Sequence, residues 1–372
     1  MAMMFLAPPL RRPYELYYFC KLTDDVVIII DKESYIIDSD YYDEEFGTLN
    51  YQYFFVPIAK TRIGKFLQGG STALLVTYDD AELAKIIRDK NIEIVVTVEA
   101  SSSLSAQASH LSSKFSLRHI VIVWDNLKKS PFSYIPPFSN YTKIVKSTAS
   151  KFIAVSNKSK DALISWHIGE DKIETVYPGI FVNKFKPSAD SADKILFVGN
   201  LEPHKGVRVL LYAFKKLSTH FSDIELILVG RGSLEKEIIK LRDSGLRIDL
   251  RGYFTRSKLR DVYSDCSIFC SPSLKWRVKL IITGQEQFGF TLVEAMASGL
   301  PVVTSNIGTI PEVVGSQNLV VTPRIDNVFA ALHKLITSDD LRKELRDNNR
   351  LRSLSKFDAI TQSIVFKKAI DT

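Results

Sequence analysis

Two carboxylates bracket a glycine turn in the segment Glu286-Gln-Phe-Gly-Phe-Thr-Leu-Val-Glu294. A helix that begins near Phe290 would hold Glu294 one turn inside it and Glu286 in the loop ahead of it, so both side chains can face one ligand. The first N–H groups of such a helix, at Gly289, Phe290 and Thr291, form an anion site suited to a diphosphate. A carboxylate that accepts two hydroxyl hydrogen bonds can recognise a ribose or a hexose. On the alternative interpretation, Glu286 is a loop charge and Glu294 an exposed helix residue.

The elements that position these residues follow from the hydrophobic pattern. Short apolar runs alternate with helical-period stretches, which predicts βαβ units and a doubly wound α/β fold with parallel sheets. In the first half we predict strands at Met3–Ala7, Val26–Asp31, Leu74–Tyr78, Ile92–Val98, His119–Trp124, Phe152–Ser156 and Thr175–Tyr177. Helices are predicted between them at Asp80–Asp89, Leu104–Lys114 and Lys158–Trp166. In the second half we predict strands at Ile195–Gly199, Glu225–Gly230, Ile248–Gly252, Ser267–Ser271, Pro301–Ser305 and Leu319–Thr322, each followed by a helical stretch.

The length of 372 residues exceeds what one hydrophobic core usually serves, so two domains are expected. Tyr177–Pro187 combines turn residues with no sustained period, and we place the linker there. Phe357–Ile370 has the pattern of a helix with no strand after it, which is consistent with a chain that ends by crossing back over a cleft.

The composition is that of an ordinary globular protein, with 45% apolar and 24% charged residues. The longest apolar candidate, Val26–Ile30, is far shorter than a membrane-spanning helix. Met1–Pro9 lacks the pattern of a signal peptide, so we expect a cytoplasmic protein. Cys20, Cys266 and Cys270 show no paired spacing and are interpreted as small core residues.

The net charge of +7 is unevenly distributed. Residues 101–150 contain 6 basic and 1 acidic side chains, an excess that suits a phosphate or an anionic membrane surface, or else a solvated face without a partner. The chain has no combined aromatic and basic motif, so no nucleic acid is expected. Gly230-Arg-Gly lacks the third glycine of a dinucleotide fingerprint, Asp38-Ser-Asp40 fits a solvated acidic loop, and the histidines lack zinc-ligand spacing. We therefore expect neither a cofactor nor a metal.

The C-terminal half resembles the family 4 retaining glycosyltransferases, and Glu286 and Glu294 match that family's pair of glutamates. Other segments follow the family in order: Phe197-Val-Gly-Asn-Leu-Glu-Pro-His-Lys-Gly206, Leu226-Ile-Leu-Val-Gly-Arg-Gly232, Leu250-Arg-Gly252, Ser271-Pro-Ser273 and Gly308-Thr-Ile-Pro-Glu-Val-Val-Gly315. Ala154-Val-Ser156 and Tyr177-Pro-Gly179 match the end of its first domain. The resemblance covers about residues 150–372 well, and earlier residues by pattern.

This resemblance implies the GT-B architecture, in which two Rossmann-like domains face each other across a cleft. The domains implied are an acceptor-side domain at 1–180, a nucleotide-sugar-binding domain at 181–355, and a C-terminal helix at 356–372 that returns towards the first domain. Glu294 is implied to bind the nucleotide ribose, and Glu286 to contact the donor sugar near the reacting carbon. Lys205 and the helix start are implied to hold the diphosphate, with Gly199 and Asn200 in the same loop.

The sequence departs from the family at two positions. The family has an arginine beside the phosphate-binding lysine, and Asn200 stands in its place. The candidates to replace that cation are Arg208, Arg231, Arg277 and Lys279. Many members also have a histidine at the end of the strand that here leads into Trp124 and Asp125.

Asp125 is the candidate to take over the hydrogen bond of that histidine to the donor sugar, the alternative being an ordinary cap. Glu99, at the end of the preceding strand, is a weaker candidate for the same role. Arg11 and Arg12 replace a glycine-rich first loop and are candidates to contact an acceptor phosphate. The apolar and basic insertion between Ser273 and Glu286 is interpreted as an acceptor or membrane contact, or as a buried loop.

The leading hypothesis is transfer of a hexose from a nucleotide diphosphate sugar to a glycan or lipid-linked acceptor, with an α linkage and no nucleophilic carboxylate. The expected catalytic residues are Glu286, Lys205 and Asp125. The partners are then the donor, the acceptor and a peripheral contact at the inner face of the membrane. The alternatives are a nucleotide-sugar epimerase of the same fold and a non-catalytic glycosyltransferase-like binding protein.

Overall fold

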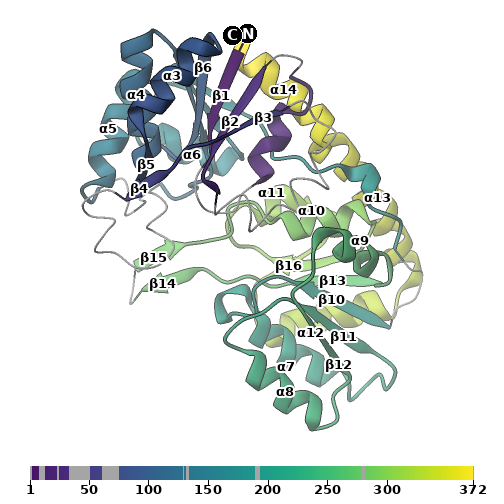
Figure 1. Ribbon diagram of the computed structural model, residues 1–372. Coiled ribbons are helices and arrows are strands. Elements are labelled where there is room, and N and C mark those ends of the chain that lie inside the picture. Colours follow the sequence, from purple (N-terminus) through teal and green to yellow (C-terminus); the bar gives the residue numbers. More distant parts are fainter. Residues whose placement is uncertain are drawn as a thin grey trace. The chain divides into compact units, whose positions relative to one another are not determined.

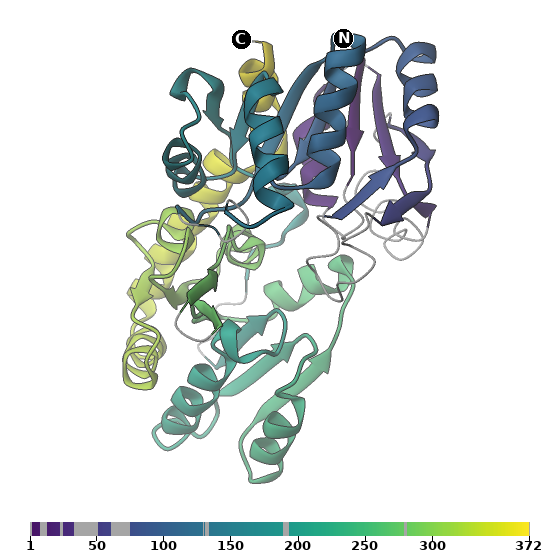
Figure 2. The same ribbon diagram turned by 90° about the vertical axis from the view of Figure 1, so that its left-hand side faces the viewer.

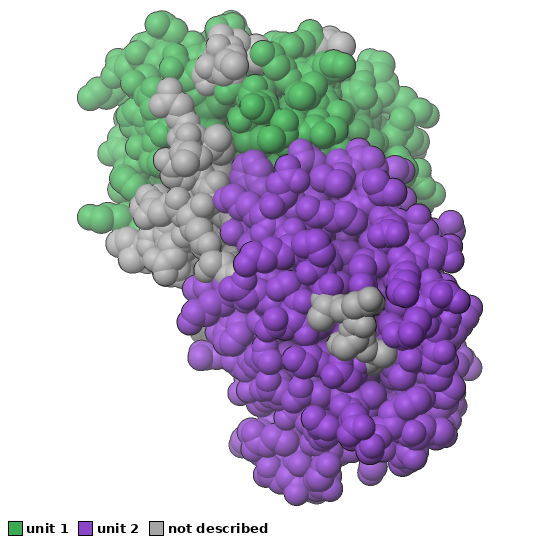
Figure 3. All heavy atoms as spheres, turned by 90° about the vertical axis from the view of Figure 1, so that its right-hand side faces the viewer, with its two compact units in different colours: residues 1–179, 359–372 green, residues 180–358 purple. Residues whose placement is uncertain are grey.

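The chain divides into two compact units, which are coloured separately in Figure 3. The first contains Met1–Gly179 and Ala359–Thr372, and the second contains Ile180–Asp358. The computed structural model describes residues 2–7, 13–22, 25–32, 51–60, 75–128, 130, 134–188, 193–278 and 281–371. Arg11, Arg12 and the pair Asp38 and Asp40 lie outside these ranges.

The first unit is built on a seven-stranded parallel sheet with the order β3-β2-β1-β6-β7-β8-β9. Its strands are β1 (Ala2–Leu6), β2 (Val26–Ile30), β3 (Tyr51–Phe55), β6 (Ile92–Val98), β7 (Arg118–Val123), β8 (Lys151–Ala154) and β9 (Ile173–Thr175). The central strands are continuous apolar runs that are buried along their whole length, as expected when helices cover both faces of a parallel sheet. The predicted doubly wound fold is confirmed for this unit.

Helices pack on this sheet with their apolar faces inward. They are η1 (Pro13–Phe19), α3 (Asp80–Asp89), α4 (Ser103–Phe115), α5 (Phe138–Thr148), α6 (Asn157–Ser165), η4 (Glu170–Lys172) and α14 (Ala359–Asp371). Figures 1 and 2 show α3, α4 and α5 on one face and η1 with α14 on the other. The terminal helix joins the first unit through the backbone N–H of Lys21, which donates to Ser363 Oγ at 2.8 Å.

The second unit contains a six-stranded parallel sheet with the order β12-β11-β10-β13-β16-β17. Its strands are β10 (Lys194–Val198), β11 (Glu225–Val229), β12 (Ile248–Gly252), β13 (Ile268–Ser271), β16 (Val302–Ser305) and β17 (Leu319–Val321). This is the strand order of a Rossmann fold, in which the order reverses between the first and fourth strands of the sheet. Here that switch point lies between β10 and β13.

The connections of the second unit are mostly helical. They are η5 (Val182–Lys184), η6 (Pro203–Lys205), α7 (Val207–Leu217), α8 (Glu235–Asp243), α9 (Arg256–Ser264), α10 (Phe290–Ala297), α11 (Ile310–Val314), α12 (Ile325–Ile336) and α13 (Asp339–Phe357). Helix α7 packs against α12, and α10 packs against α9, α11 and α13 (Figure 1). Cys266 and Cys270 are buried in this unit as predicted, whereas Cys20 of the first unit is only partly buried.

Three elements differ from the sequence prediction. The predicted strand Leu74–Tyr78 is β5 (Val76–Tyr78), which pairs antiparallel with β4 (Ile58–Lys60) instead of joining the main sheet. β3 was not predicted, because its half-buried residues lack a continuous apolar run. The insertion after Ser273, for which no strands were predicted, is a hairpin of β14 (Trp276–Val278) and β15 (Ile281–Gly284).

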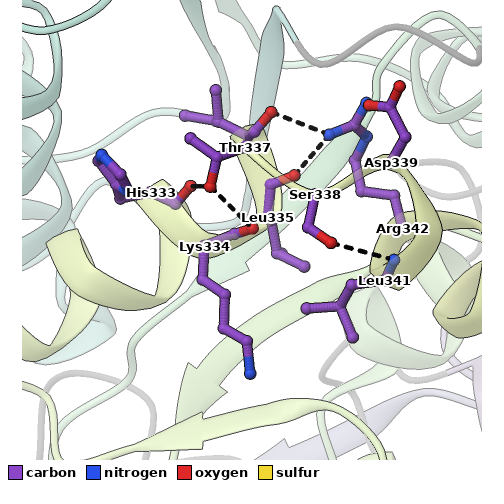
Figure 4. A network of polar contacts seen from close by, with 9 residues as sticks. His333, Lys334, Leu335, Thr337, Ser338, Asp339, Leu341 and Arg342 are labelled. Atoms are coloured by element: carbon purple, nitrogen blue, oxygen red, sulfur yellow. Dashed lines mark hydrogen bonds and ion pairs between the residues drawn. The ribbon is translucent and has the colours of Figure 1, made fainter.

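A buried arginine joins the last two helices of the second unit (Figure 4). Arg342 of α13 is 4% exposed and donates from Nη1 to the carbonyls of Leu335 and Ile336, at 2.5 and 3.0 Å. Its Nη2 also pairs with Asp339. The last carbonyls of a helix have no partner within the helix, so Arg342 supplies donors that the end of α12 needs.

We expect Arg342→Ala to destabilise the second unit. Loss of hydrogen bonds from a charged group costs about 1.5–3 kcal/mol each, and a unit of this size loses about 2–4 °C of Tm per kcal/mol. Loss of its two hydrogen bonds to α12 should therefore lower Tm by at least about 6 °C in differential scanning calorimetry. Lys343→Ala, at the exposed neighbouring position, is the control. Equal melting temperatures for the two variants would contradict the role given to Arg342.

Candidate functional site

The predicted phosphate loop lies at the switch point of the second sheet. β10 ends at Val198 and leads into residues 199–206, which we call the phosphate loop, while the neighbouring β13 ends at Ser271 and leads into Pro272 and Ser273. In open α/β sheets, ligands bind outside the carboxyl ends of the strands at this point. The sheet order therefore brings together two loops that are more than sixty residues apart in the sequence.

Glycine allows these two loops to touch. Gly206 has φ +74°, a left-handed conformation, and a Cβ built on it would lie 1.9 Å from the carbonyl oxygen of Pro272. The N–H of Leu274 also donates to the carbonyl of His204 at 2.8 Å. The backbone of the phosphate loop is thus in direct contact with the segment after β13.

An ion pair between Lys205 and Glu286 is the centre of the site. Lys205 Nζ lies 2.8 Å from Glu286 Oε2, and the two side chains are 22% and 17% exposed. Ser273 Oγ donates to the same carboxylate oxygen at 3.2 Å. The carbonyl of Glu286 accepts from both the N–H and the hydroxyl of Thr309, each at 3.2 Å. Glu286 is therefore held both at its backbone carbonyl and at its carboxylate, unlike a charged loop residue that only meets solvent.

Helix α10 begins at Phe290, where the sequence predicted it. Gly289 precedes it with φ +88°, and no side-chain hydrogen bond caps the N-terminus of this helix. A Cβ on Gly289 would lie 3.7 Å from Cγ of Glu286, so the helix start is beside the Glu286 side chain. The first-turn N–H groups, including those of Phe290 and Thr291, therefore favour an anion next to the Lys205–Glu286 pair.

Glu294 lies inside α10 and is 4% exposed, so the alternative of an exposed helix residue is wrong. Its Oε2 accepts from the hydroxyl of Tyr263, on α9, at 2.9 Å. A buried carboxylate needs such donors to remain favourable. The packing of α9 on α10 thus positions the second glutamate of the pair.

The position expected for the family arginine is occupied by Asn200, which is exposed. Of the replacement cations, Arg208 is paired with Glu237 at 2.9 Å. Arg231 is exposed, and its carbonyl accepts from the N–H of Leu201 at 2.9 Å, so its backbone adjoins the phosphate loop. The side chain of Arg277 and the residue Lys279 lie outside what the structure describes. Arg231 is accordingly the better placed of the two cations that can be compared.

Asp125 lies in the first unit, at the carboxyl end of β7, whereas Lys205, Glu286 and Glu294 all lie in the second. Its Oδ1 accepts from the N–H of Leu127 at 2.9 Å, as in an ordinary cap of its own turn. Burial raises the pKa of the Asp125 carboxyl. One oxygen of Asp125 therefore acts as an ordinary cap, which was the alternative interpretation. The contact of Asp125 with a sugar stays a prediction.

Glu99 follows β6 with φ +64°, an uncommon conformation for a residue with a side chain. Its Oε1 accepts from the N–H of Trp124 at 3.2 Å, so it holds the backbone that leads to Asp125. Glu99 thus contacts the backbone next to Asp125.

Ser273 and Tyr263 were not foreseen as functional residues of the site, and Trp276 was foreseen only as part of the insertion. Ser273 was visible in the Ser-Pro-Ser motif, although not its bond to Glu286. No local pattern marks Tyr263, because its role depends on how α9 packs. Trp276 was part of the insertion and lies against His204, with 4.7 Å between the ring centroids. Burial lowers the pKa of His204, and the charge of Lys205 lowers it further.

Two features of the described residues concern metal binding and insertion into a membrane. Among these residues, no group of three or more His, Cys, Asp or Glu side chains could hold a metal ion. Within the same ranges, no helix has both the length and the hydropathy needed to cross a bilayer.

Residues 181–352, almost all of the second unit, match the family model of glycosyl transferases group 1. The match covers somewhat less than half of the chain, so the second unit is similar to the glycosyl transferases of group 1. The site described above, from the phosphate loop to α10, lies entirely within the matched residues.

Two relatives of the chain are named mannosyltransferases. The chain is 29% identical over 248 residues to the MMP alpha-(1->4)-mannosyltransferase of Mycolicibacterium hassiacum, covering 63% of this chain and 57% of the relative. It is 31% identical over 185 residues to the phosphatidyl-myo-inositol mannosyltransferase of Mycolicibacterium smegmatis, covering 47% and 45%. The chain thus spans about half the length of these relatives.

The fold of the whole chain is similar to that of a solved structure. It aligns with Anabaena Alr3699/HepE, crystallised in complex with UDP, at a TM-score of 0.75 and 18% identity over 100% of both chains. This likeness supports the predicted GT-B fold with its two Rossmann-like sheets.

Proposed function

We propose that this chain is a retaining glycosyltransferase, which moves a hexose from a nucleotide diphosphate sugar to a glycan or lipid-linked acceptor and forms an α linkage. The observation that supports this most is the cluster of Lys205, Glu286 and Ser273 beside the start of α10, at the switch point of a parallel sheet. It combines a cation and a helix N-terminus for a diphosphate with a carboxylate for sugar hydroxyls.

Each residue of the cluster has a role in this proposal. Lys205 and the N–H groups of α10 stabilise the negative charge that develops on the departing diphosphate. Glu286 accepts hydrogen bonds from the hexose near the reacting carbon, and Glu294 accepts them from the nucleotide ribose. No residue forms a covalent bond to the sugar, so retention requires the acceptor hydroxyl to attack from the face that the diphosphate leaves, and the departing diphosphate takes the hydroxyl proton. Positioning and charge neutralisation then supply the catalysis.

The ion pair implies a rearrangement when the donor binds. A diphosphate competes with Glu286 for Lys205 Nζ, because both are anions and the pair is partly exposed. As Lys205 turns to the diphosphate, Glu286 becomes available to the sugar hydroxyls. We propose Arg231 as the second cation that Asn200 does not provide, and Asp125 as the contribution of the first unit to the donor sugar.

The same proposal covers location and partners. We propose that the protein acts in the cytoplasm without a metal or a resident cofactor. A lipid-linked acceptor would bring it to the inner face of the membrane, where the basic excess of residues 101–150 suits anionic lipids.

A panel of nucleotide sugars tests the proposal. HepE has been crystallised with UDP-glucose, and several relatives are named mannosyltransferases, so the panel contains UDP-glucose, UDP-N-acetylglucosamine and GDP-mannose. We expect one donor to release its nucleoside diphosphate, and NMR of the glycoside to show an α anomer. A β anomer would contradict retention. Epimerised donor without release would indicate the epimerase, and binding without reaction the non-catalytic protein.

Tyr263→Phe tests the role of Glu294. The substitution removes the hydroxyl that donates to Glu294, so the carboxylate loses a positioning bond while the ring is kept. A hydrogen bond to a charged group contributes about 1.5–3 kcal/mol, and we expect nucleoside diphosphate to bind roughly 10-fold more weakly in calorimetry. Tyr212→Phe, at an exposed tyrosine of α7, is the matched control. Unchanged affinity in Tyr263→Phe would contradict the ribose contact.

A further inference from the structure

The hairpin β14–β15 begins and ends at the site. It is inserted between Ser273 and Glu286, the two residues that share a hydrogen bond at 3.2 Å. Its strands pair antiparallel, with Trp276 opposite Gly284. The first strand of the hairpin therefore starts three residues after a side chain that contacts the Glu286 carboxylate.

Trp276 holds this hairpin against the phosphate loop. Its ring lies edge-on to His204, with centroids 4.7 Å apart and planes at 73°. A Cβ on Gly284 would lie 2.4 Å from Cε3 of the indole, so the glycine leaves room for the ring. Lys205 Nζ lies 5.8 Å from the ring centroid. Neighbours on the opposite strand and in the phosphate loop thus hold the indole in position.

Trp276 is nevertheless 38% exposed. The other two tryptophans, Trp124 and Trp166, are 3% and 8% exposed and belong to the first unit. A large aromatic that is held in place and still meets solvent is already ordered for binding, so a ligand that stacks on it loses little side-chain entropy. Lys205 contacts both the indole and the carboxylate of Glu286. The ring therefore lies near the carboxylate that we propose to bind the sugar.

The chemistry of the neighbours indicates which ligand fits. A pyranose has a face of C–H groups that packs on an aromatic ring and a rim of hydroxyls that donates to a carboxylate. Trp276 offers the aromatic surface, and Glu286 the carboxylate. We propose that Trp276 is a stacking platform for a pyranose ring of the substrate, beside Glu286. This rests on the proposed function and adds a specificity-determining residue, which the inserted hairpin supplies.

Fluorescence measures this binding without turnover. Because Trp276 is the exposed tryptophan, iodide should quench mainly its emission, and Trp276→Phe should remove most of that quenching. We expect a nucleotide sugar or an acceptor saccharide to reduce iodide quenching of the wild-type protein by at least half. The free nucleoside diphosphate should reduce it by much less. The proposal that Trp276 is a stacking platform would be contradicted if the free nucleoside diphosphate protected Trp276 from iodide equally well, or if no saccharide protected it.

Kinetics identify which sugar stacks. Trp276→Ala should raise KM about 10-fold for the substrate whose pyranose stacks: the donor, measured as hydrolysis without acceptor, or the acceptor, measured at saturating donor. Trp276→Phe keeps an aromatic ring and should stay within about 3-fold of wild type. Inhibition by the free nucleoside diphosphate should be unchanged in both variants. If Trp276→Ala weakened binding of the free nucleoside diphosphate as much as it raised KM, the indole would only support His204 and Lys205.

The two proposals fail in different ways. If a nucleotide sugar protects Trp276 from iodide but no donor on the panel reacts, the platform stands and the proposed transfer fails. If sugar transfer occurs and Trp276→Ala equals wild type in both KM values, the transfer stands and the platform fails.

Discussion

Replacement of Lys205 by alanine should lower kcat/KM for sugar transfer by about 100- to 1,000-fold. In the proposed reaction Lys205 neutralises charge on the departing diphosphate, and loss of one such group costs about 2.7–4 kcal/mol of transition-state stabilisation. The effect should be large here because Asn200 occupies the position of the second cation of the family. The measurement is release of nucleoside diphosphate from the best donor of the panel.

Lys216→Ala is the matched control for this prediction. Lys216 also forms an ion pair at 2.8 Å, with Asp326, but it lies on the exposed surface between α7 and α12. Its loss should leave kcat/KM within about twofold of wild type, since exposed ion pairs contribute little. If kcat/KM of Lys205→Ala also remained within about twofold of wild type, the proposed role of Lys205 would be contradicted.

Replacement of Glu286 by glutamine should change transfer and nucleotide binding in opposite directions. Loss of the carboxylate removes the proposed contact to the sugar, and we expect kcat to fall about 100-fold. The same substitution releases Lys205 from its ion pair, so the free nucleoside diphosphate should bind about 2- to 5-fold more tightly. Calorimetry with the diphosphate, beside the transfer assay, measures both effects.

Two further variants make this prediction specific. Glu237→Gln breaks the ion pair with Arg208 outside the site and should change neither quantity. In the double variant Lys205→Ala/Glu286→Gln the gain in diphosphate affinity should disappear, because Glu286 acts on the diphosphate through Lys205. Weaker binding of the diphosphate to Glu286→Gln would show that the carboxylate does not compete for Lys205.

Local features of the site were predictable from the sequence. The helix start at Phe290 follows from Gly289, whose positive φ sets the turn, and from the apolar residues after it. β6 and β12 have the predicted bounds, because apolar residues that run together or alternate between turn residues are a local signal. In contrast, Val76–Tyr78 has the same kind of signal, yet its partner is β4 in a separate pair of strands. A short apolar run does not specify which strand it joins.

Contacts within the site were not predictable in this way. Lys205 meets Glu286 because β10 and β13 are neighbours in the sheet and Gly206 lets their loops touch. Tyr263 meets Glu294 because α9 packs on α10. The insertion was interpreted as an acceptor or membrane contact, or as a buried loop. The pairing of its two strands places Trp276 against His204.

By itself, the sequence determined the doubly wound fold, the helix start beside Glu286, and which residues are chemically suited to a nucleotide sugar. These follow from the spacing of apolar residues and glycines over a few turns of chain. Only the tertiary structure decided that Lys205 is paired with Glu286, that Glu294 is buried against Tyr263, and that the inserted hairpin presents Trp276 at the site. The physical reason is that such contacts depend on strand order and helix packing, which bring together residues far apart in the sequence.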